Sequence, residues 1–540
     1  MIPVAQACVR ERTFLPLKLR PLTLALGIIG LTTAPCEAFS ANGDRATAGQ
    51  LWLAQGLESR SPPPRLWGET SGGDEAFVQL TPEEDRWLRA AWAYFNGAPA
   101  PQAPPPQAPP PPQAQPAPPP VQQQPSPPQP VQQQWSGNPG GGFVPSPSDP
   151  RLLVEVRAGT NVATPWSIAD QLAALLIAHR MGLIDARTFD RRATRLVDFL
   201  NWMTLTPDRM PNRFYNVDSG TALGGDLQPG IAGWSAVETG RLLLWLRIAA
   251  EEHPKFAPFI RNAVARLSVC RIISDRSQLQ IATAGPDGLQ TAPETGRGYD
   301  AYGAQGYRAW GMEVPVPEVQ DVYPYETEIL GLRFPLTEDV DNQAPLMTTP
   351  PAYLGLELGF ATLGDRVDEV AGGRAADDLM AALAEVQARA YAQTGRPMGR
   401  SDFRRGEDPT TIFATALAQG YPWSVIAPDG SLRPSLALVS TRAAFALNTF
   451  ADDANAALLL SLVEELYDPG TGWYEGRYET TGAYEMTRTS ATNAFVMATV
   501  AYRNLGPLFP DTARPTDLQP VTQGSDGRCI LPLANPSPPF

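Results

Sequence analysis

The spacing of apolar residues along the chain predicts a long series of helices. Thr81–Glu84 carries the N-cap, first-turn proline and capping glutamate that start a helix. Apolar residues then recur at intervals of three and four through Phe95, which predicts the first helix. The same spacing predicts further helices over Trp166–Met181, Ala186–Met203, Ser235–Glu252, Lys255–Val269, Arg297–Trp310, Ala352–Leu363, Ala375–Ala392, Thr410–Gln419, Thr441–Asp452, Ala454–Tyr467 and Thr487–Asn504.

These helices are of two kinds. Ser235–Glu252 is largely apolar beyond its first turn, and Ala454–Leu462 and Phe495–Ala501 are small and apolar. Ala186–Met203 and Ala375–Ala392 instead carry a charged stripe, which is typical of a helix with one solvated face. Strand-like alternation is scarce. We therefore predict an all-α fold, an α/α toroid of about six helical hairpins with apolar helices inside and amphipathic helices outside.

Composition divides the chain into segments. Residues 39–80 show no sustained periodicity, and residues 97–148 consist almost entirely of Pro, Gln, Ala, Ser and Gly without a charged residue. Such a composition cannot form a core, so we predict a disordered insertion. A lone amphipathic helix cannot bury its aromatic face, so the first helix, residues 81–96, is expected to pack on the toroid domain, residues 149–510. Residues 511–540 form a C-terminal tail.

The N-terminus has the order of a secretory signal peptide. Basic residues precede an apolar run from Leu22 to Leu31, and small residues follow up to Ala38. We expect cleavage of residues 1–38 and a periplasmic or secreted protein. A lipoprotein anchored at Cys36 is less favoured, because Pro35 stands where a small residue is wanted. Cleavage leaves Cys270 and Cys529, for which a disulfide and two free thiols both stay open.

Charge and histidine content exclude several functions. The formal net charge is −14 and the pI about 4.8, so a nucleic-acid partner is not expected, since phosphate contacts need clustered positive charge. The chain has only two histidines, His179 and His253. This argues against histidine-rich metal sites and Ser-His-Asp triads, and we predict no metal and no cofactor.

The helical run resembles a bacterial family known as domain of unknown function 3131. The resemblance rests on Leu80–Phe95, Pro165–Ala174, Met181–Asp185, Gly233–Leu243, Gly298–Gly311 and Gly472–Glu479, and it covers most of residues 81–507. The family is itself similar to the glucoamylase-like six-hairpin toroids. That relation implies a glucoamylase-like fold and carbohydrate chemistry. The Pro/Gln-rich insertion after the first helix departs from the family pattern.

Acids and aromatics near the starts of the inner helices are the candidate site residues, because a toroid gathers these ends on one side. Glycoside hydrolysis needs two carboxyl groups, and aromatic rings stack on sugar faces. We predict Glu238 as proton donor, with Asp300 or Glu326 as base or nucleophile. The predicted substrate-binding residues are Trp166, Asp170, Trp234, Tyr299, Tyr302, Tyr325, Trp473, Glu475 and Arg488.

Structural roles compete with these assignments. An acid in the first turn of a helix, such as Asp170 or Asp300, also stabilises the helix dipole, and Glu238 could pair with Arg241. Three functions stay open: a glycoside hydrolase or transglycosylase acting on a bacterial polysaccharide, a non-catalytic glycan-binding or exopolysaccharide-assembly factor, and, with less support, a polysaccharide lyase. The predicted partner is a polysaccharide or oligosaccharide, and the Pro/Gln-rich segment suggests a cell-envelope partner.

Overall fold

A computed structural model describes residues 79–96, 151–275, 277–294, 298–314, 325–336, 344–345, 347–364, 371–405, 412–418, 421–427, 429–515 and 517–532. All of these residues lie in the compact unit Pro62–Phe540. The predicted signal peptide, the irregular segment up to residue 78 and the Pro/Gln-rich insertion lie outside the described residues. Within the described residues, no helix is long and apolar enough to cross a membrane.

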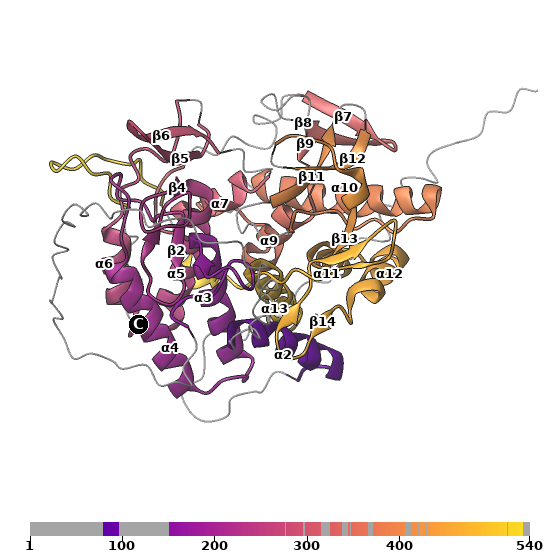
Figure 1. The fold of residues 1–540 in the computed structure, drawn as a ribbon, viewed down its shortest axis with the longest axis horizontal. Coiled ribbons are helices and arrows are strands. Elements are labelled where there is room, and N and C mark those ends of the chain that lie inside the picture. The colour runs from indigo at the N-terminus through magenta and orange to yellow at the C-terminus, as the bar shows by residue number, and fades with distance from the viewer. Residues whose placement is uncertain are drawn as a thin grey trace, which may run out of the picture. The chain divides into compact units, whose positions relative to one another are not determined.

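Six helices form a closed inner ring. Each packs on the next in chain order, and the last returns to the first (Figure 1). The six are α3 (Pro165–Arg180), α5 (Ala236–Glu252), α7 (Asp300–Arg308), α9 (Thr349–Leu358), α11 (Thr441–Phe450) and α13 (Ser490–Leu505). This closed ring, covered from outside by further helices, is an α/α toroid, so the predicted architecture is confirmed.

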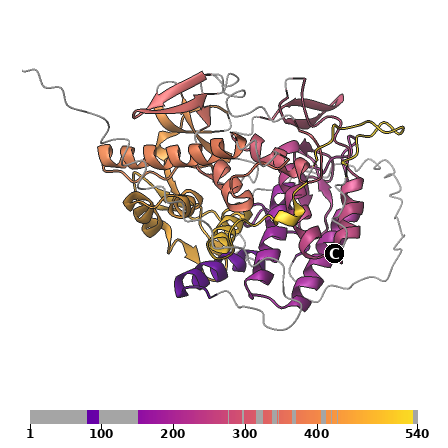
Figure 2. The same cartoon turned by 180° about the vertical axis from the view of Figure 1, so that it is seen from behind.

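The other helices cover the ring from outside. They are α2 (Pro82–Asn96), α4 (Ala186–Trp202), α6 (Ala257–Ala265), α10 (Ala371–Thr394) and α12 (Ala454–Val463). Helix α2 packs against α13 and α3, as Figure 2 shows from behind. Its residues Trp87, Trp92 and Phe95 are buried, and such burial contributes roughly 1.5–3 kcal/mol per large side chain. These side chains attach α2 to the toroid.

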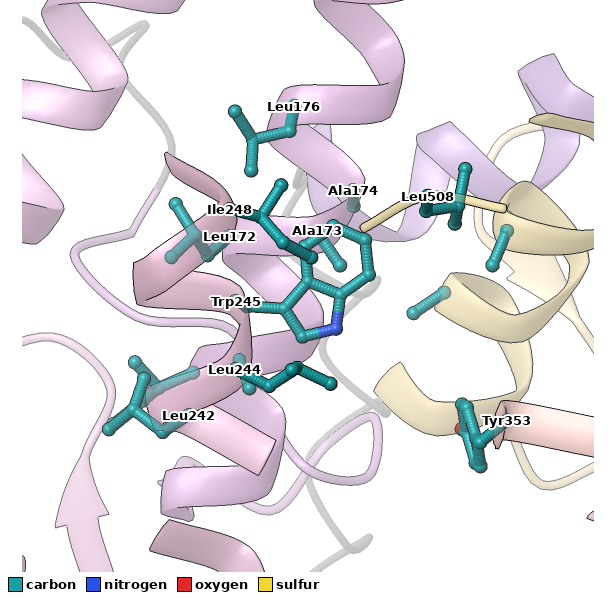
Figure 3. Packing of buried hydrophobic residues seen from close by; sticks show 14 of the residues in the cluster. Leu172, Ala173, Ala174, Leu176, Leu242, Leu244, Trp245, Ile248, Tyr353 and Leu508 are labelled. Carbon is teal, nitrogen blue, oxygen red and sulfur yellow. The ribbon is translucent and has the colours of Figure 1, made fainter. Parts of the chain in front are cut away.

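Glycines allow the closest contact in the ring, between α5 and α7. A Cβ atom on Gly306 would lie 1.7 Å from the backbone oxygen of Gly240, and one on Gly240 would lie 2.0 Å from that of Gly303. Only glycine fits at such a crossing. Nearby, Trp245 of α5 is fully buried among leucines and alanines of α3 and α5 (Figure 3). The crossing brings the first turns of α5 and α7 side by side.

Short antiparallel sheets connect the helices. They are β1 (Val162–Ala163) with β2 (Phe214–Asn216) and β3 (Ala222–Leu223); β4 (Gly233–Ser235) with β5 (Gln280–Gly285) and β6 (Gly288–Pro293); β7 (Tyr325–Ile329) with β8 (Leu332–Leu336); β9 (Ala344–Pro345), β10 (Phe403–Arg404), β11 (Ile412–Ala418) and β12 (Tyr421–Ile426); β13 (Leu438–Ser440) with β16 (Gly476–Tyr478) and β17 (Tyr484–Glu485); and β14 (Tyr467–Asp468) with β15 (Gly472–Trp473). Strands β4 and β13 lead directly into α5 and α11, so these sheets set where ring helices start.

Several sequence predictions are corrected by the structure. The helix predicted over Thr410–Gln419 is wrong, because residues 412–418 form strand β11, paired with β9, β10 and β12. Ile412 and Phe413 favour a strand. The predicted scarcity of strands is also wrong. Helix α6 is shorter than predicted, and α9 begins at Thr349, three residues before the predicted Ala352.

The C-terminal tail returns to the toroid. Cys270 and Cys529 form a disulfide, with their Cα atoms 5.0 Å apart. The backbone N–H of Val269 also donates to the carbonyl oxygen of Cys529 at 2.8 Å. Of the two possibilities that the sequence left open for Cys270 and Cys529, the structure has the disulfide.

Candidate active site

A buried ion network lies at the centre of the ring. Arg241 of α5 donates to Asp170 of α3 at 2.8 Å and to Glu357 of α9 at 3.0 Å. Tyr302 of α7 donates to Glu357 at 2.6 Å, and Ser490 of α13 donates to Asp170 at 2.8 Å. The side chains of Arg241, Asp170 and Glu357 are at most 1% exposed. We call Asp170, Arg241, Tyr302, Tyr353, Glu357 and Ser490 the central network.

The central network holds five ring helices together. The Arg241 guanidinium lies 4.4 Å from the ring centre of Tyr353 and 4.7 Å from that of Trp166, so aromatic faces cover it. The Trp245 indole N–H also donates to Glu357, at 3.1 Å. Each charged group therefore has partners on neighbouring helices, which is the condition under which buried charges are tolerated. This arrangement serves the fold rather than a substrate.

A second cluster of acids and arginines lies where the ring helices begin. It comprises Arg213, Glu238, Glu294, Asp402, Arg404 and Arg442, which we call the acid–arginine site. Glu238, Asp402 and Arg404 are only partly buried, so this site reaches solvent. That exposure distinguishes it from the central network.

Glu238 lies in the first turn of α5. Ser235 caps this helix, and its hydroxyl accepts the backbone N–H of Glu238 at 3.0 Å. The Oε2 atom of Glu238 is shielded from solvent and has no hydrogen-bond partner among the described residues. Burial raises the pKa of Glu238, while Arg213, Arg404, Thr164 and Trp166 act in the opposite direction. Arg241 binds Asp170 and Glu357 instead, so the ion pair considered between Glu238 and Arg241 is absent.

Glu294 lies directly after β6 and reaches the same helix start. Its Oε1 accepts from the Ser235 hydroxyl at 2.5 Å, and its Oε2 accepts from the Val237 N–H at 3.0 Å. Burial, helped by the nearby carboxyls of Glu238 and Asp300, raises the pKa of Glu294 to about 8, although the hydrogen bonds from Ser235 and Val237 act to lower it. Glu294 therefore fixes the start of α5, and its neutral form is favoured near neutral pH.

Asp402 is held as an anion. Its Oδ1 accepts from the Tyr299 hydroxyl at 2.8 Å and from Ser401 at 3.0 Å, and its Oδ2 accepts from Arg442 at 3.0 Å. Burial acts to raise the pKa of Asp402, but Arg442 and these hydroxyls outweigh burial, and the pKa is lowered. Glu238 and Asp402 thus have pKa values displaced in opposite directions.

Arg404 connects the two carboxyls. Burial lowers the pKa of Arg404, and the charges of Glu238, Glu475 and Asp402 act to raise it. The charges of Glu238 and Asp402 therefore both act on the Arg404 guanidinium. Glu475 completes the surroundings, since its Oε2 accepts the Arg404 backbone N–H at 3.4 Å.

Five of the predicted substrate-binding residues are buried inside the protein: Asp170, Trp234, Tyr302, Trp473 and Glu475. Trp234 is fully buried and donates its indole N–H to Asp208 at 2.8 Å. Trp473 is fully buried and donates to the backbone oxygen of Trp87 at 3.1 Å. Asp170 and Tyr302 belong to the central network. The rings of Trp234, Tyr302 and Trp473 have no exposed surface for stacking on a sugar, and Asp170 is bound by Arg241 and Ser490.

The other predicted residues, and the buried Glu475, lie in four different surroundings. Trp166 and Tyr299 pack edge to face at 5.2 Å beside the acid–arginine site, and Asp300 acts on Glu294 there. Glu475 is buried, and Thr489 and Thr492 donate to it at 2.5 and 2.7 Å. Arg488 instead binds the side chain of Thr471. The backbones of Tyr325 and Glu326 form part of β7, and their side chains lie outside the described residues.

The family assignment follows from a comparison of sequences. A family model described as "Protein of unknown function (DUF3131)" matches residues 150–506. The chain belongs to this family. The resemblance drawn from its motifs is therefore confirmed, and no curated protein matches the chain.

Solved structures share the fold of this DUF3131 chain. A "putative glucoamylase" from Bacteroides fragilis NCTC 9343 is 14% identical, with a TM-score of 0.51, over 81% of this chain and 95% of that chain. An endo-beta-1,2-glucanase from Chitinophaga pinensis is 14% identical, with a TM-score of 0.48, over 66% and 88%. An alpha-1,2-mannosidase from Trichoderma reesei is 12% identical, with a TM-score of 0.39, over 68% and 82%. The first of these shows that the fold is shared.

Sequence reasoning missed five residues of the DUF3131 site: Arg213, Glu294, Asp402, Arg404 and Arg442. Two signals were available for part of this set. Arg400–Arg405 is a dense charged cluster in a chain with only 18% charged residues. Arg442 is the second residue of α11, where the helix dipole disfavours a cation unless acids lie nearby. Glu294 and Arg213 carry no comparable local signal, because their partners are distant in sequence.

Proposed function

We propose that this protein is a glycoside hydrolase whose acid is Glu238 and whose base is Asp402. The observation that carries the proposal is a pair of partly buried carboxyls with different partners: Glu238 has an unpartnered Oε2, and Asp402 is bound by Tyr299 and Arg442. Burial accordingly raises the pKa of Glu238, and Arg442 lowers that of Asp402. A general acid must hold its proton near neutral pH, and a base must stay ionised. The toroid fold supports the proposal in one respect: both carboxyls lie on the side of the ring where its helices begin.

Glu238 acts first in the proposed mechanism. Its protonated carboxyl donates to the glycosidic oxygen as the bond between that oxygen and the anomeric carbon breaks. The unpartnered Oε2 is free to do so without losing another hydrogen bond. Ser235 and Glu294 fix the turn of α5 that carries Glu238, and thus orient the acid.

Asp402 acts on the incoming nucleophile. The carboxylate takes a proton from the attacking water, or from a sugar hydroxyl if glycosyl transfer occurs. Arg442 and Tyr299 keep it ionised beforehand. Trp166 and Tyr299 lie next to these groups and offer aromatic surface to a sugar ring. Solvent then exchanges protons with both carboxyls and restores the starting state.

Product release from a panel of bacterial polysaccharides tests this proposal. The mature protein is compared with Glu238→Gln and Asp402→Asn, with melting temperature and glycan binding measured on the same samples. General acid–base groups contribute roughly 10²- to 10⁴-fold to rate, so each variant should lose that much turnover. The exposed Arg86→Gln on α2 serves as a matched control. Binding without product release by the wild type would indicate a glycan-binding or assembly factor instead.

We also propose that the protein is exported. The order of basic, apolar and small residues before Ala38 supports this, and so does the Cys270–Cys529 disulfide, because disulfides persist in oxidising compartments. A cell-envelope partner for the Pro/Gln-rich segment stays a prediction. Mass determination of the protein from fractionated cells should give an N-terminus near residue 39 in the exported fraction. A full-length chain confined to the cytoplasm would contradict export.

A further inference from the structure

Arg213 projects from a rigid part of the acid–arginine site. Its neighbour Asn212 is fully buried and donates to the carbonyl oxygens of Phe214 and Leu223 at 2.6 and 2.9 Å. The Asn212 side-chain oxygen also accepts the Ala232 N–H at 2.8 Å, and the Arg213 N–H donates to Gly233 at 2.9 Å. These bonds attach the residue to the strand that leads into α5.

The Arg213 guanidinium has no bound acceptor. It is partly buried and lies 5.2 Å from the ring centre of Phe214, and the described residues provide no hydrogen bond or ion pair to its side chain. Its charge nevertheless acts on the carboxyl of Glu238. A guanidinium has five donors, and partial burial without acceptors costs free energy. The N–H groups of such a guanidinium can donate to the oxygen atoms of a ligand.

In the proposed mechanism, the positive charge of Arg213 is left without a neutralising carboxylate. Glu238 is neutral while it serves as acid, so it cannot then neutralise Arg213. The other charged groups that face Glu238 are Arg404, which is shared with Asp402 and Glu475, and Glu294, whose neutral form is favoured. During the reaction, Arg213 is therefore a cation beside the reacting bond, with no anion of the described chain bound to it.

We propose that the substrate is an acidic glycan, and that Arg213 binds a carboxylate on the sugar next to the scissile bond. This inference rests on the proposed function and deepens it by naming the substrate class. A guanidinium fork matches a carboxylate with two parallel hydrogen bonds, which a neutral sugar hydroxyl cannot provide. The carboxylate supplies the anion that the protein itself lacks at this point.

Paired ligands separate charge recognition from general sugar binding. A uronate oligosaccharide, prepared from a polyuronate, is compared with the same oligosaccharide after chemical reduction of its carboxyls to alcohols. Calorimetric titration uses the Glu238→Gln variant, which mimics the neutral acid and stops turnover. We expect the acidic ligand to bind roughly 10- to 100-fold more tightly than the reduced one, as hydrogen bonds to charged groups suggest.

Arg213→Gln in the same background should remove that preference and leave the affinity for the reduced ligand unchanged. Arg86→Gln, an exposed arginine on α2, should change neither affinity. A sulfated oligosaccharide provides the third arm: Arg213-dependent binding of the sulfated ligand alone would support an anionic substrate with a sulfate as the anion. Equal binding of acidic and reduced ligands by the wild-type Arg213 chain, or binding of no acidic ligand, would overturn the inference.

The two proposals fail in different ways. Arg213-dependent binding of an acidic glycan without any product release would reject the hydrolase and leave the acidic ligand established. Release from neutral glycans at rates independent of Arg213 would reject the acidic substrate and leave the hydrolase established.

Discussion

The central network and the acid–arginine site both include residues of helix α5 but differ in how completely their charges are partnered. Arg241 is 1% exposed and has carboxylate partners on both sides. Arg213, from the loop before β2, has no bound acceptor among the described residues, and Glu238 Oε2 likewise has none. A partnered network stabilises one conformation, whereas a partly exposed cation without an acceptor, such as Arg213, is available to a ligand.

This difference predicts that mutations in the central network change stability, whereas mutations in the acid–arginine site change activity or binding. Removing a member of the central network should reduce stability, because the remaining charges stay buried without partners. Removing Glu238 or Arg213 should instead change activity or binding at nearly constant stability. The following predictions test this contrast, beginning with the largest expected change in stability.

Arg241→Ala should give the largest loss of stability. The substitution leaves Asp170 and Glu357 buried without their cation, and breaking a buried pair from one side costs about 3–5 kcal/mol. Urea unfolding at neutral pH measures the change. Arg213→Ala is the matched control and should cost less than about 1 kcal/mol. Similar losses for the two variants would remove the distinction between the regions.

Gly306→Ala should give an intermediate loss. The new methyl group would meet the backbone oxygen of Gly240 at 1.7 Å, so α5 and α7 must separate. Overpacking of this kind costs about 1–3 kcal/mol. Gly395→Ala is a control without overpacking, because nothing lies within 4 Å of its Cβ position. Any loss of stability in that variant comes from the strain of its positive φ. Turnover should also fall for Gly306→Ala, because the starts of both helices shift.

Glu294 should produce an effect on stability that depends on pH. Its pKa is about 8 in the folded protein against an ordinary 4.5, so the folded state holds the proton more strongly than the unfolded state. Its contribution is complete below pH 4.5 and is lost as the pH rises toward 8. Glu294→Gln mimics the neutral acid and should flatten this decline. Unfolding free energies at pH 5, 6.5 and 8 measure it, and parallel profiles for both proteins would contradict the assignment.

The fold was largely predictable because its signals are local and repeated. Apolar spacing and caps such as Thr81–Glu84 located most helices, and the alternation of apolar and amphipathic helices indicated the toroid. Strand β11 was missed although its partners β10 and β12 lie near it in sequence. Its third partner, β9, is distant in sequence, and pairing of that kind leaves little local pattern.

The candidate site was predictable only in part. Glu238 was noticeable as an acid in an apolar helix, and Trp166 and Tyr299 lie at the starts of ring helices as expected. Trp234 and Trp473 were misplaced because an aromatic residue near a helix start or loop can as easily fill the core. Asp402 could not be chosen from sequence, since its ionisation depends on Tyr299 and Arg442, which are brought to it only by closure of the ring.

The most direct test of the central claim compares two isosteric substitutions, Glu238→Gln and Glu357→Gln. Both remove one acidic oxygen from a ring helix. Unfolding free energy and product release from the best glycan of the panel are measured on both. Glu238→Gln should lose roughly 10²- to 10⁴-fold in turnover at unchanged stability, whereas Glu357→Gln should lose stability first. Wild-type turnover by Glu238→Gln, or a loss of stability equal to that of Glu357→Gln, would contradict the account.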